Sequence, residues 1–380
     1  MKKVNVLIFV KSVDGGTGTF VLALSEIEKL FNKKNFNLRL IALEKPSYRK
    51  VEKNRIFYYR NKNFYPNKYT SLLRSIFNFI TESIWLKKQI VESESNIIIG
   101  VDIHCNLLTQ FTNLFILRRK PKVILTTHID LDSTISDKSS KMIGLLLKRM
   151  VKFFYDKADV LVCSSEYLAR DLRKSFKLKK KPIAIYDARD LMINKSPKLY
   201  KRGKSKKIIT IARLTEQKDY PTLINAFSIL NREFPQLKLL IASDGPQRGE
   251  LEKMVEEMKL TKNVIFLGWV KDIFKYIENS DIFVFSSKRE GFAYVLVEAM
   301  SKGIPVVSTN TPFGPSEVLK NGQYGLLVPV GDYKELAKSV ATILNNKNKY
   351  SYYAKRSLER SKFFSQQKMI EEYKNLIIKL

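Results

Sequence analysis

Sulfur and imidazole side chains are scarce in this chain of 380 residues, which contains two cysteines and two histidines. Cys105 and Cys163 stand far apart in apolar surroundings, and neither belongs to a Cys-x-x-Cys pair. A disulfide framework and a zinc site with Cys or His ligands are therefore excluded as the basis of the fold. We expect both thiols to be buried, in a protein of a reducing compartment.

Long apolar runs are missing as well. No run reaches the roughly 18 apolar residues that a membrane-spanning helix needs. The start of the chain, residues 1–10, is apolar but is interrupted by Asn5 and ends at Lys11 without a small-residue cleavage site. It therefore predicts a strand rather than a signal peptide, and we expect a cytoplasmic protein.

Acidic residues are too few to balance the basic ones, since 68 Lys and Arg face 37 Asp and Glu, a formal net charge of +31. Residues 1–200 hold 38 basic and 18 acidic residues (+20), and residues 201–380 hold 30 and 19 (+11). Such a surface attracts nucleic acid, anionic lipid or phosphorylated substrates. The basic stretches 174–181 and 201–207 belong to no recognised nucleic-acid-binding module, so we expect no nucleic acid partner.

Strand and helix patterns alternate along the whole chain, which predicts an α/β protein with doubly wound parallel sheets. Periodicity disappears between residues 187 and 207, where a solvated interdomain linker is predicted. The predicted strands are 4–10, 38–43, 97–101, 123–127, 160–163 and 183–185, then 208–212, 237–241, 264–267, 282–285 and 305–308. The predicted helices include 19–31, 70–91, 107–117, 141–157, 222–230 and 366–380.

One stretch organises the second half of the chain. The apolar strand 282–285 leads into Ser-Ser-Lys-Arg-Glu290-Gly-Phe-Ala-Tyr-Val-Leu-Val-Glu298-Ala-Met, and Gly303 and Pro305 end the helix that follows. Glu290 is therefore expected in a loop at the carboxyl end of a strand, with Gly291 to Tyr294 opening a helix whose free N–H groups suit a phosphate. Glu290 and Glu298 stand about 12 Å apart if both are helical. This spacing does not suit the paired carboxylates of a glycoside hydrolase.

The pattern Glu-Gly-Phe-x5-Glu-Ala-Met followed by Gly-x-Pro-Val-Val, from Glu290 to Val307, resembles the Glu-x7-Glu motif of retaining glycosyltransferase family 4. The resemblance implies the GT-B fold, with two Rossmann-like domains that face a central cleft. It implies an acceptor-side domain over 1–190, a linker over 191–206, a nucleotide-sugar-binding domain over 207–363, and a helix over 364–380 that crosses back to the first domain.

The segment after strand 208–212 resembles the family's Gly-Arg-Leu-x-x-x-Lys-Gly motif. The resemblance implies that Arg213 and Lys218 grip the donor diphosphate, and two fixed cations stabilise a departing diphosphate without a metal. Ala212 and Asp219 depart from the family's glycines, although both cations remain. We expect no metal site, because the Asp130–Asp132 pair lies in the first domain.

Further site residues follow from the same resemblance. His128 matches a histidine that contacts the donor sugar, Glu290 is expected to bind the sugar, and Glu298 the ribose. The role of His104 stays open, with a structural role favoured. Trp269 is expected near the base or in the core. The predicted catalytic residues are His128, Arg213, Lys218 and Glu290, and the predicted donor-binding residues are Gly15, Gly16, Asp244, Gly245, Val270, Gly291, Phe292, Ala293, Tyr294, Val295 and Glu298.

The leading hypothesis is a retaining, metal-independent hexosyltransferase of polysaccharide or glycolipid synthesis. It takes no cofactor, uses a nucleotide sugar (UDP slightly preferred over GDP), and acts on a glycan or lipid-linked glycan acceptor. An anionic membrane surface on the inner face of the cytoplasmic membrane is an expected further partner, bound by salt-screened electrostatics. Alternatives are an NAD-dependent oxidoreductase, disfavoured because Val21 replaces the third fingerprint glycine, a basic nucleic-acid-binding protein, and an inactive scaffold.

Overall fold

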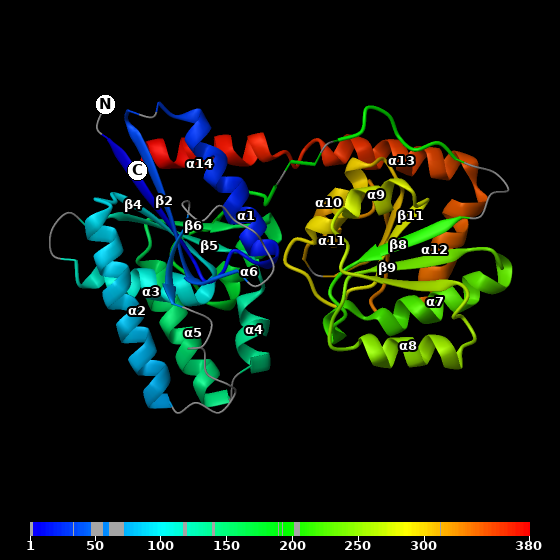
Figure 1. Ribbon diagram of the computed structural model, residues 1–380, viewed down its shortest axis with the longest axis horizontal. Helices are drawn as coiled ribbons and strands as arrows, with labels where there is room; N and C mark the ends of the chain where they lie inside the picture. The colour runs from blue at the N-terminus through cyan, green and yellow to red at the C-terminus, as the bar shows by residue number, and fades with distance from the viewer. Residues whose placement is uncertain are drawn as a thin grey trace. The chain divides into compact units, whose positions relative to one another are not determined.

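The computed structural model describes residues 3–32, 34–46, 56–60, 72–116, 120–138, 141–188, 190–191, 193–200, 206–311 and 313–380. The chain forms two compact units, each built on a parallel sheet with helices between the strands (Figure 1). Unit 1 comprises Met1–Asp190 and Gln366–Leu380, and unit 2 comprises Leu191–Ser365. The predicted α/β class with two doubly wound sheets is confirmed.

The sheet of unit 1 has the strand order β3-β2-β1-β4-β5-β6-β7. The chain builds outward from β1 on one side and then returns to continue from β4 on the other. The carboxyl ends of β1 and β4 therefore meet at a topological switch point, the usual ligand position in such sheets. The strands are β1 (Val4–Val10), β2 (Phe36–Glu44), β3 (Ile56–Arg60), β4 (Ile97–Val101), β5 (Lys122–Thr127), β6 (Val160–Cys163) and β7 (Ile183–Ala184).

Helices cover both faces of this sheet and close three apolar clusters of described residues around it. Tyr373 of the last helix is fully buried, so the end of the chain contributes to the core of unit 1. Cys105 and Cys163 are both buried free thiols. The helices are α1 (Gly15–Ser25), η1 (Glu26–Leu30), α2 (Leu72–Glu92), α3 (Asp102–Leu114), α4 (Leu131–Lys138), α5 (Lys141–Asp156), α6 (Glu166–Ser175) and α14 (Gln366–Lys379).

The sheet of unit 2 has the order β10-β9-β8-β11-β12-β13, with its switch point between β8 and β11. The strands are β8 (Lys207–Ile211), β9 (Lys238–Ala242), β10 (Val264–Gly268), β11 (Ile282–Phe285), β12 (Val306–Thr309) and β13 (Leu326–Val328). The helices are η3 (Glu216–Lys218), α7 (Tyr220–Glu233), α8 (Arg248–Glu257), α9 (Ile273–Glu278), α10 (Tyr294–Ser301), α11 (Pro315–Val318), α12 (Tyr333–Asn345) and α13 (Lys347–Ser361).

Three local expectations differ from the structure. Helix α1 begins at Gly15, four residues before the predicted start at residue 19, because the glycines take helical geometry instead of forming an open loop. Strand β3 was not predicted. Part of the predicted solvated linker is anchored on unit 2, since Asn194 N–H donates to Ser301 O (2.9 Å) and Lys198 N–H to Gly303 O (2.9 Å). Residues 192 and 201–205 of that linker lie outside the described residues.

Candidate active site

The predicted donor residues of unit 2 follow the strands that flank its switch point. Arg213 and Lys218 follow β8, and Glu290 follows β11, the neighbouring strand in the sheet. In parallel sheets the carboxyl ends of adjacent strands lie at the same edge, so these side chains gather where ligands usually bind.

The loop after β8 owes its shape to one residue with left-handed backbone geometry. Asp219 has φ 49° and ψ 50° between η3 and α7. Aspartate tolerates this region better than most residues, and glycine adopts it freely, so this backbone geometry suits either residue. The Asp219 carboxylate accepts a hydrogen bond from Thr222 Oγ1 at 2.8 Å, which ties the turn to the start of α7.

A second set of hydrogen bonds joins this loop to the one after β11. Ser286 Oγ donates to Lys218 O (2.8 Å), Ser287 Oγ donates to Gln217 O (3.0 Å), and Lys288 N–H donates to the same Gln217 carbonyl (2.8 Å). Three donors therefore hold two loops that are about 70 residues apart in the chain. The backbone that carries Lys218 is fixed against the backbone that carries Glu290.

The side chains of Lys218 and Glu290 form an ion pair at the centre of this arrangement. They are 18% and 9% exposed, respectively. The Lys218 ammonium also lies 5.4 Å from the centroid of the Phe285 ring, within cation–π range. Arg213 is exposed, and no hydrogen bond or ion pair of its side chain occurs within the described part of the chain.

The predicted turn after β9 lies beside the same loop. Leu214 N–H donates to Asp244 O at 3.0 Å, and a Cβ added to Gly245 would lie 2.4 Å from Leu214 O, so only glycine fits there. The Asp244 carboxylate accepts hydrogen bonds from Gly245 N–H (2.8 Å) and Arg248 (3.0 Å), and these bonds hold its pKa below the usual value. Asp244 is thus engaged within its own turn.

Helix α10 begins at Tyr294, so the prediction that Gly291 opens the helix is wrong by three residues. Ala293 precedes the helix in left-handed geometry (φ 60°) and delays its start. Gly314 (φ 72°) packs under this loop, where an added Cβ would meet Phe292 C at 2.9 Å and Glu290 Cβ at 3.0 Å. Gly314 was not chosen as a site residue, although its contact with the Glu290 loop shows that it shapes the site.

The remaining predicted donor residues differ in burial. Glu298 is buried in α10, 6% exposed, whereas Tyr294 and Val295 are half-buried in its first turn. Val270 is half-buried. Trp269 is 67% exposed, so the alternative that its ring belongs to the core is wrong.

In unit 1, three predicted residues lie at the carboxyl edge of the sheet. Gly15 and Gly16 form the first turn of α1, directly after β1. A Cβ at Gly18 would lie 1.9 Å from Val13 O, so this third glycine lets the helix pack on the preceding loop. His128 follows β5 and is bonded to Asp187 at 2.8 Å. Across the switch point, Asp102 takes left-handed geometry (φ 69°), a strained state that the sequence did not reveal.

The other titratable residues considered from the sequence have separate partners. His104 Nε2 contacts Glu82 Oε2 at 2.8 Å, and Asp132 pairs with Lys148 at 2.6 Å. Among the described residues, no three His, Cys, Asp or Glu side chains gather as a group that could hold a metal ion. The same part of the chain contains no helix long and apolar enough to cross a membrane.

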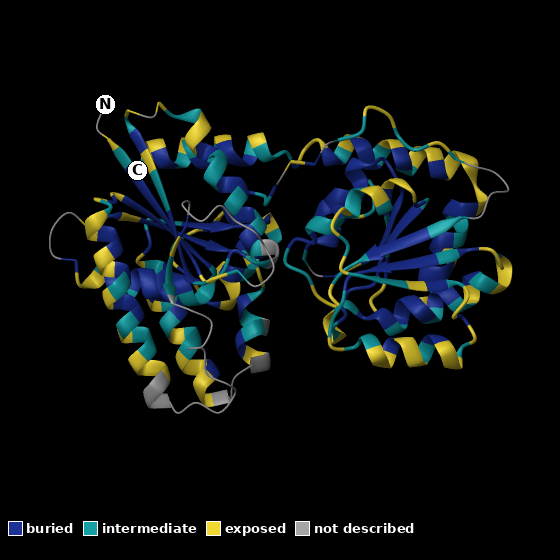
Figure 2. Ribbon diagram, in the orientation of Figure 1, coloured by how far each residue is buried: buried dark blue, intermediate teal, exposed yellow. Residues whose placement is uncertain are grey.

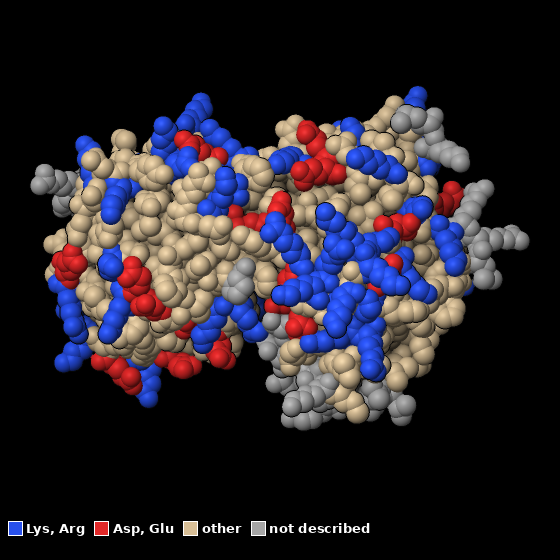
Figure 3. Space-filling view, turned by 180° about the vertical axis from the view of Figure 1, so that it is seen from behind, with Lys and Arg blue, Asp and Glu red and all other residues tan. Residues whose placement is uncertain are grey.

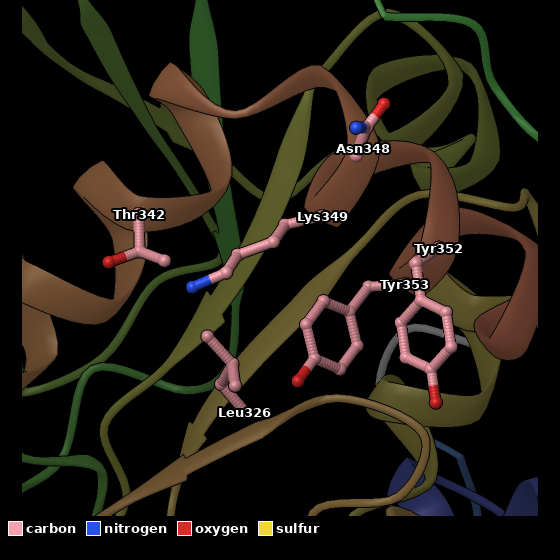
Figure 4. A pocket seen from close by; sticks show the side chains of 6 residues that line it. All are labelled: Leu326, Thr342, Asn348, Lys349, Tyr352 and Tyr353. Carbon is pink, nitrogen blue, oxygen red and sulfur yellow. The ribbon is translucent and has the colours of Figure 1, made fainter.

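A pocket of about 400 Å³ lies elsewhere in unit 2, between β13, α12 and α13 (Figure 4). None of the predicted donor residues lines it. The close-up shows Lys349 extending toward Leu326 beside the two tyrosine rings. The lining residues are Leu326, Thr342, Asn348, Lys349, Tyr352 and Tyr353.

Comparison with known proteins places the chain in a family. A family model described as glycosyltransferase family 4 matches residues 15–187, and one described as glycosyl transferases group 1 matches residues 192–360. An uncharacterized glycosyltransferase of Methanocaldococcus jannaschii is 30% identical over 60% of this chain and 65% of its own length. An N-acetylgalactosaminyltransferase of Campylobacter jejuni, named for its diphospho-undecaprenol-linked acceptor, is 29% identical over 60% of this chain and 62% of its own length.

The alignments with these two relatives therefore span less than two thirds of each. An uncharacterized glycosyltransferase of Haemophilus influenzae is 24% identical over 99% of this chain and all of its own length. Among solved structures, sucrose-phosphate synthase from Thermosynechococcus elongatus matches with a TM-score of 0.80 at 17% identity, over 99% of this chain and 98% of its own. Anabaena HepE, crystallised with UDP, matches with a TM-score of 0.73 at 17% identity, over the whole length of both chains. The chain belongs to glycosyltransferase family 4 and has the GT-B fold.

Proposed function

We propose that the protein is a retaining glycosyltransferase that transfers a hexose or N-acetylhexosamine from a nucleoside-diphosphate sugar to a glycan or lipid-linked glycan. The observation that carries this proposal is the cluster at the switch point of unit 2. There, Lys218 pairs with Glu290 on loops held by a common set of hydrogen bonds, and Arg213 lies on the same loop as Lys218, exposed to solvent. Two cations and a carboxylate on these loops match the needs of a departing diphosphate and of a sugar hydroxyl, respectively.

Lys218 has two competing anionic partners in this scheme. It is paired with Glu290 in the structure, and a donor diphosphate that binds its ammonium draws it away from that carboxylate. The released Glu290 carboxylate then accepts a hydrogen bond from the donor sugar. The charge that grows on the leaving phosphate is stabilised by Lys218 and Arg213, and this phosphate takes the proton from the acceptor hydroxyl. Attack from the same face keeps the anomeric configuration. We propose that no metal is needed.

The identities of donor and acceptor are supported by the relatives. HepE and a pneumococcal O-GlcNAc transferase, both similar in fold, were crystallised with UDP, which favours a UDP-sugar donor over a GDP-sugar. The Campylobacter relative is named for a diphospho-undecaprenol-linked acceptor. We therefore favour a lipid-linked glycan acceptor, in cell-envelope polysaccharide or glycolipid synthesis. The oxidoreductase and nucleic-acid alternatives are not favoured, because both halves of the chain match glycosyltransferase models.

Unit 1 has a surface that suits the membrane in which such an acceptor resides. Figure 3 shows Lys and Arg side chains crowded together on this unit, seen from behind. Between residues 141 and 181 the chain holds 12 basic and 4 acidic residues. Exposed basic residues of α5, α6 and the loops after them are Arg149, Lys157, Arg170, Arg173, Lys174, Lys177, Lys179 and Lys181.

Helix α5 also presents apolar side chains to solvent. Helix α5 leaves Met142 81%, Leu145 53%, Leu146 59% and Phe153 51% exposed, as the yellow positions along it illustrate (Figure 2). Basic and apolar residues on one helix are typical of helices that lie in the membrane interface. We propose that α5 docks unit 1 on anionic lipid at the inner face of the cytoplasmic membrane. The apolar contribution makes this attraction only partly sensitive to salt, unlike the purely electrostatic docking expected from charge alone.

The donor assignment is tested by calorimetric titration with UDP, GDP and ADP and their sugars. We expect binding of a UDP-sugar that Arg213→Ala weakens, while Lys253→Ala on the exposed face of α8 leaves it unchanged. Transfer to a lipid-linked acceptor is then followed with the preferred donor, and Glu290→Gln should abolish turnover. If the protein bound none of these nucleotides or their sugars, the proposal would be refuted.

A further inference from the structure

The ring of His128 is held by three side chains of unit 1. Its Nδ1 atom lies 2.8 Å from Asp187 Oδ2, and its Nε2 atom lies 3.0 Å from Thr126 Oγ1. Phe20 of α1 packs on the ring, with centroids 4.3 Å apart. The side chain is only 6% exposed, so both nitrogens must find their partners inside the protein.

The positions of the protons follow from counting donors and acceptors. Thr126 Oγ1 also lies 3.1 Å from the Gly100 carbonyl oxygen, which can only accept a hydrogen bond. With the single hydroxyl proton of Thr126 donated to Gly100 O, Oγ1 accepts a hydrogen bond from His128 Nε2–H. The Asp187 carboxylate accepts from Nδ1–H. Both ring nitrogens then carry a proton, which is the imidazolium form.

We propose that Asp187 and Thr126 are positioning residues that hold His128 as an imidazolium at the carboxyl edge of the unit 1 sheet. Its catalytic consequence rests on the proposed function. An imidazolium cannot take a proton, so His128 supplies a fixed positive charge and hydrogen-bond donors, and is not the base of the transfer reaction. The acceptor proton must go elsewhere, in agreement with its transfer to the leaving phosphate.

The charged surroundings favour this state. Burial lowers the pKa of His128, but the charge and hydrogen bond of Asp187 and the charge of Asp102 on α3 together raise it above its usual 6.5. Lys11, after β1, acts on Asp102 rather than on the ring. From α14, Tyr373 lies 5.8 Å from Phe20, and burial, followed by the charge of Asp187, raises its pKa well above the ordinary value, so it stays neutral.

Two further observations show that the group is organised around a cation. Asp102 Oδ1 and Asp187 Oδ1 are both buried and without a hydrogen-bond partner among the described residues. Buried carboxylate oxygens that lack a donor are costly unless a nearby positive charge offsets them. With a neutral His128, Asp187 would have no ion-pair partner among the described residues, and Asp102 would keep the charge of Lys11 but lose that of His128. Asp102, one of these two carboxyl groups, lies at the switch point in strained left-handed backbone geometry (φ 69°).

Nitrogen NMR tests the proposal directly, because the chain has only two histidines. In histidine-labelled protein, His104→Gln leaves the signals of His128 alone. At about pH 7 we expect both ring nitrogens of His128 to show the shifts of protonated nitrogen. Asp187→Asn and Thr126→Val should each lower the pH at which these signals convert to those of a neutral ring, by about one unit, the scale of one lost hydrogen bond. A neutral ring in the parent protein at this pH would overturn the proposal.

His104 provides a matched comparison in the same protein. It contacts one carboxylate, Glu82, at the same 2.8 Å, but is 40% exposed and makes no second hydrogen bond or ion pair with its side chain among the described residues. Glu82→Gln should leave the His128 signals unchanged. Equal sensitivity of His128 to Glu82→Gln and Asp187→Asn would show that general destabilisation causes the shift, and would also refute the proposal.

Activity gives a second readout. Thr126→Val should lower kcat and move the alkaline limb of the pH profile to lower pH, and Thr126→Ser should restore both, since it keeps the hydroxyl. An unchanged pH profile in Thr126→Val would count against the positioning role. If the NMR spectrum shows the imidazolium but no nucleotide sugar is used, the inference stands and the proposed function fails.

Discussion

From the ion pair between Lys218 and Glu290 we predict that the effects of the two residues on the free energy of unfolding are coupled. Removing one member of a buried pair costs about 3–5 kcal/mol of unfolding free energy, because the other charge stays buried and unpaired. The exposures of 18% and 9% let water reach the survivor in part, so we expect about 2 kcal/mol for Lys218→Ala or Glu290→Ala. The double variant should lose about 1–2 kcal/mol less than the sum of the two.

Scanning calorimetry of the parent protein, the two single variants and the double variant measures this cycle. The unfolding transition of unit 2 is the one to follow, because both residues belong to it. The exposed pair Lys253–Glu257 is the control, since its side chains are 76% and 66% exposed at 3.8 Å, and its coupling should be below about 0.5 kcal/mol. Arg213→Ala and Lys218→Ala should each reduce turnover by about 10²–10³-fold, but Arg213→Ala should leave the unfolding temperature unchanged. Strictly additive losses for Lys218 and Glu290 would refute a functional exchange of partners at this pair.

Three other predictions address the metal, the histidine and the membrane. Turnover should persist in excess EDTA, and loss that Mn²⁺ restores would contradict metal independence. Because the folded pKa of His128 is raised, its contribution to stability is complete below about pH 6.5 and is lost as the pH rises through the folded pKa, so the difference in unfolding temperature between the parent and His128→Gln should shrink at alkaline pH. The double variant Leu145→Ser, Leu146→Ser should bind liposomes about 30-fold more weakly at high salt, because each half-exposed leucine contributes about 1 kcal/mol. The control Leu199→Ser should bind as the parent does. Equal loss in both variants would argue against insertion of α5.

Much of the fold follows from local pattern. Strands β1, β4, β6 and β11 match their predicted ranges because each is a continuous apolar run bounded by polar residues. Helix α1 was placed four residues late because glycines normally indicate a turn. Here Gly18 is required by contact with Val13, and the preceding glycines continue into the helix. Strand β3 was not predicted because it is an edge strand that pairs only with β2. Few of its side chains are buried, so it contributes little to the core.

The site was predictable as a set of residues but not as a set of contacts. The sequence indicated Lys218 and Glu290 separately, and assigned both to the donor. Their pairing across 72 residues depends on the order of β8 and β11 in the sheet, which no local pattern encodes. The partners of His128 likewise come from positions 2 and 59 residues away. Asp219 shows the opposite case, since its departure from glycine was visible and its left-handed geometry suits either residue.

The two buried cysteines have a practical consequence for observing this protein at work. Burial raises the pKa of both thiols, well above the usual value at Cys105 and strongly at Cys163, so neither exposes a reactive thiolate at neutral pH. A single cysteine introduced on an exposed position of each unit, such as Glu166 of α6 and Lys338 of α12, would therefore carry a fluorophore without background labelling. Energy transfer between the two dyes would then report, molecule by molecule, whether the distance between the two labelled positions changes as donor and acceptor are added.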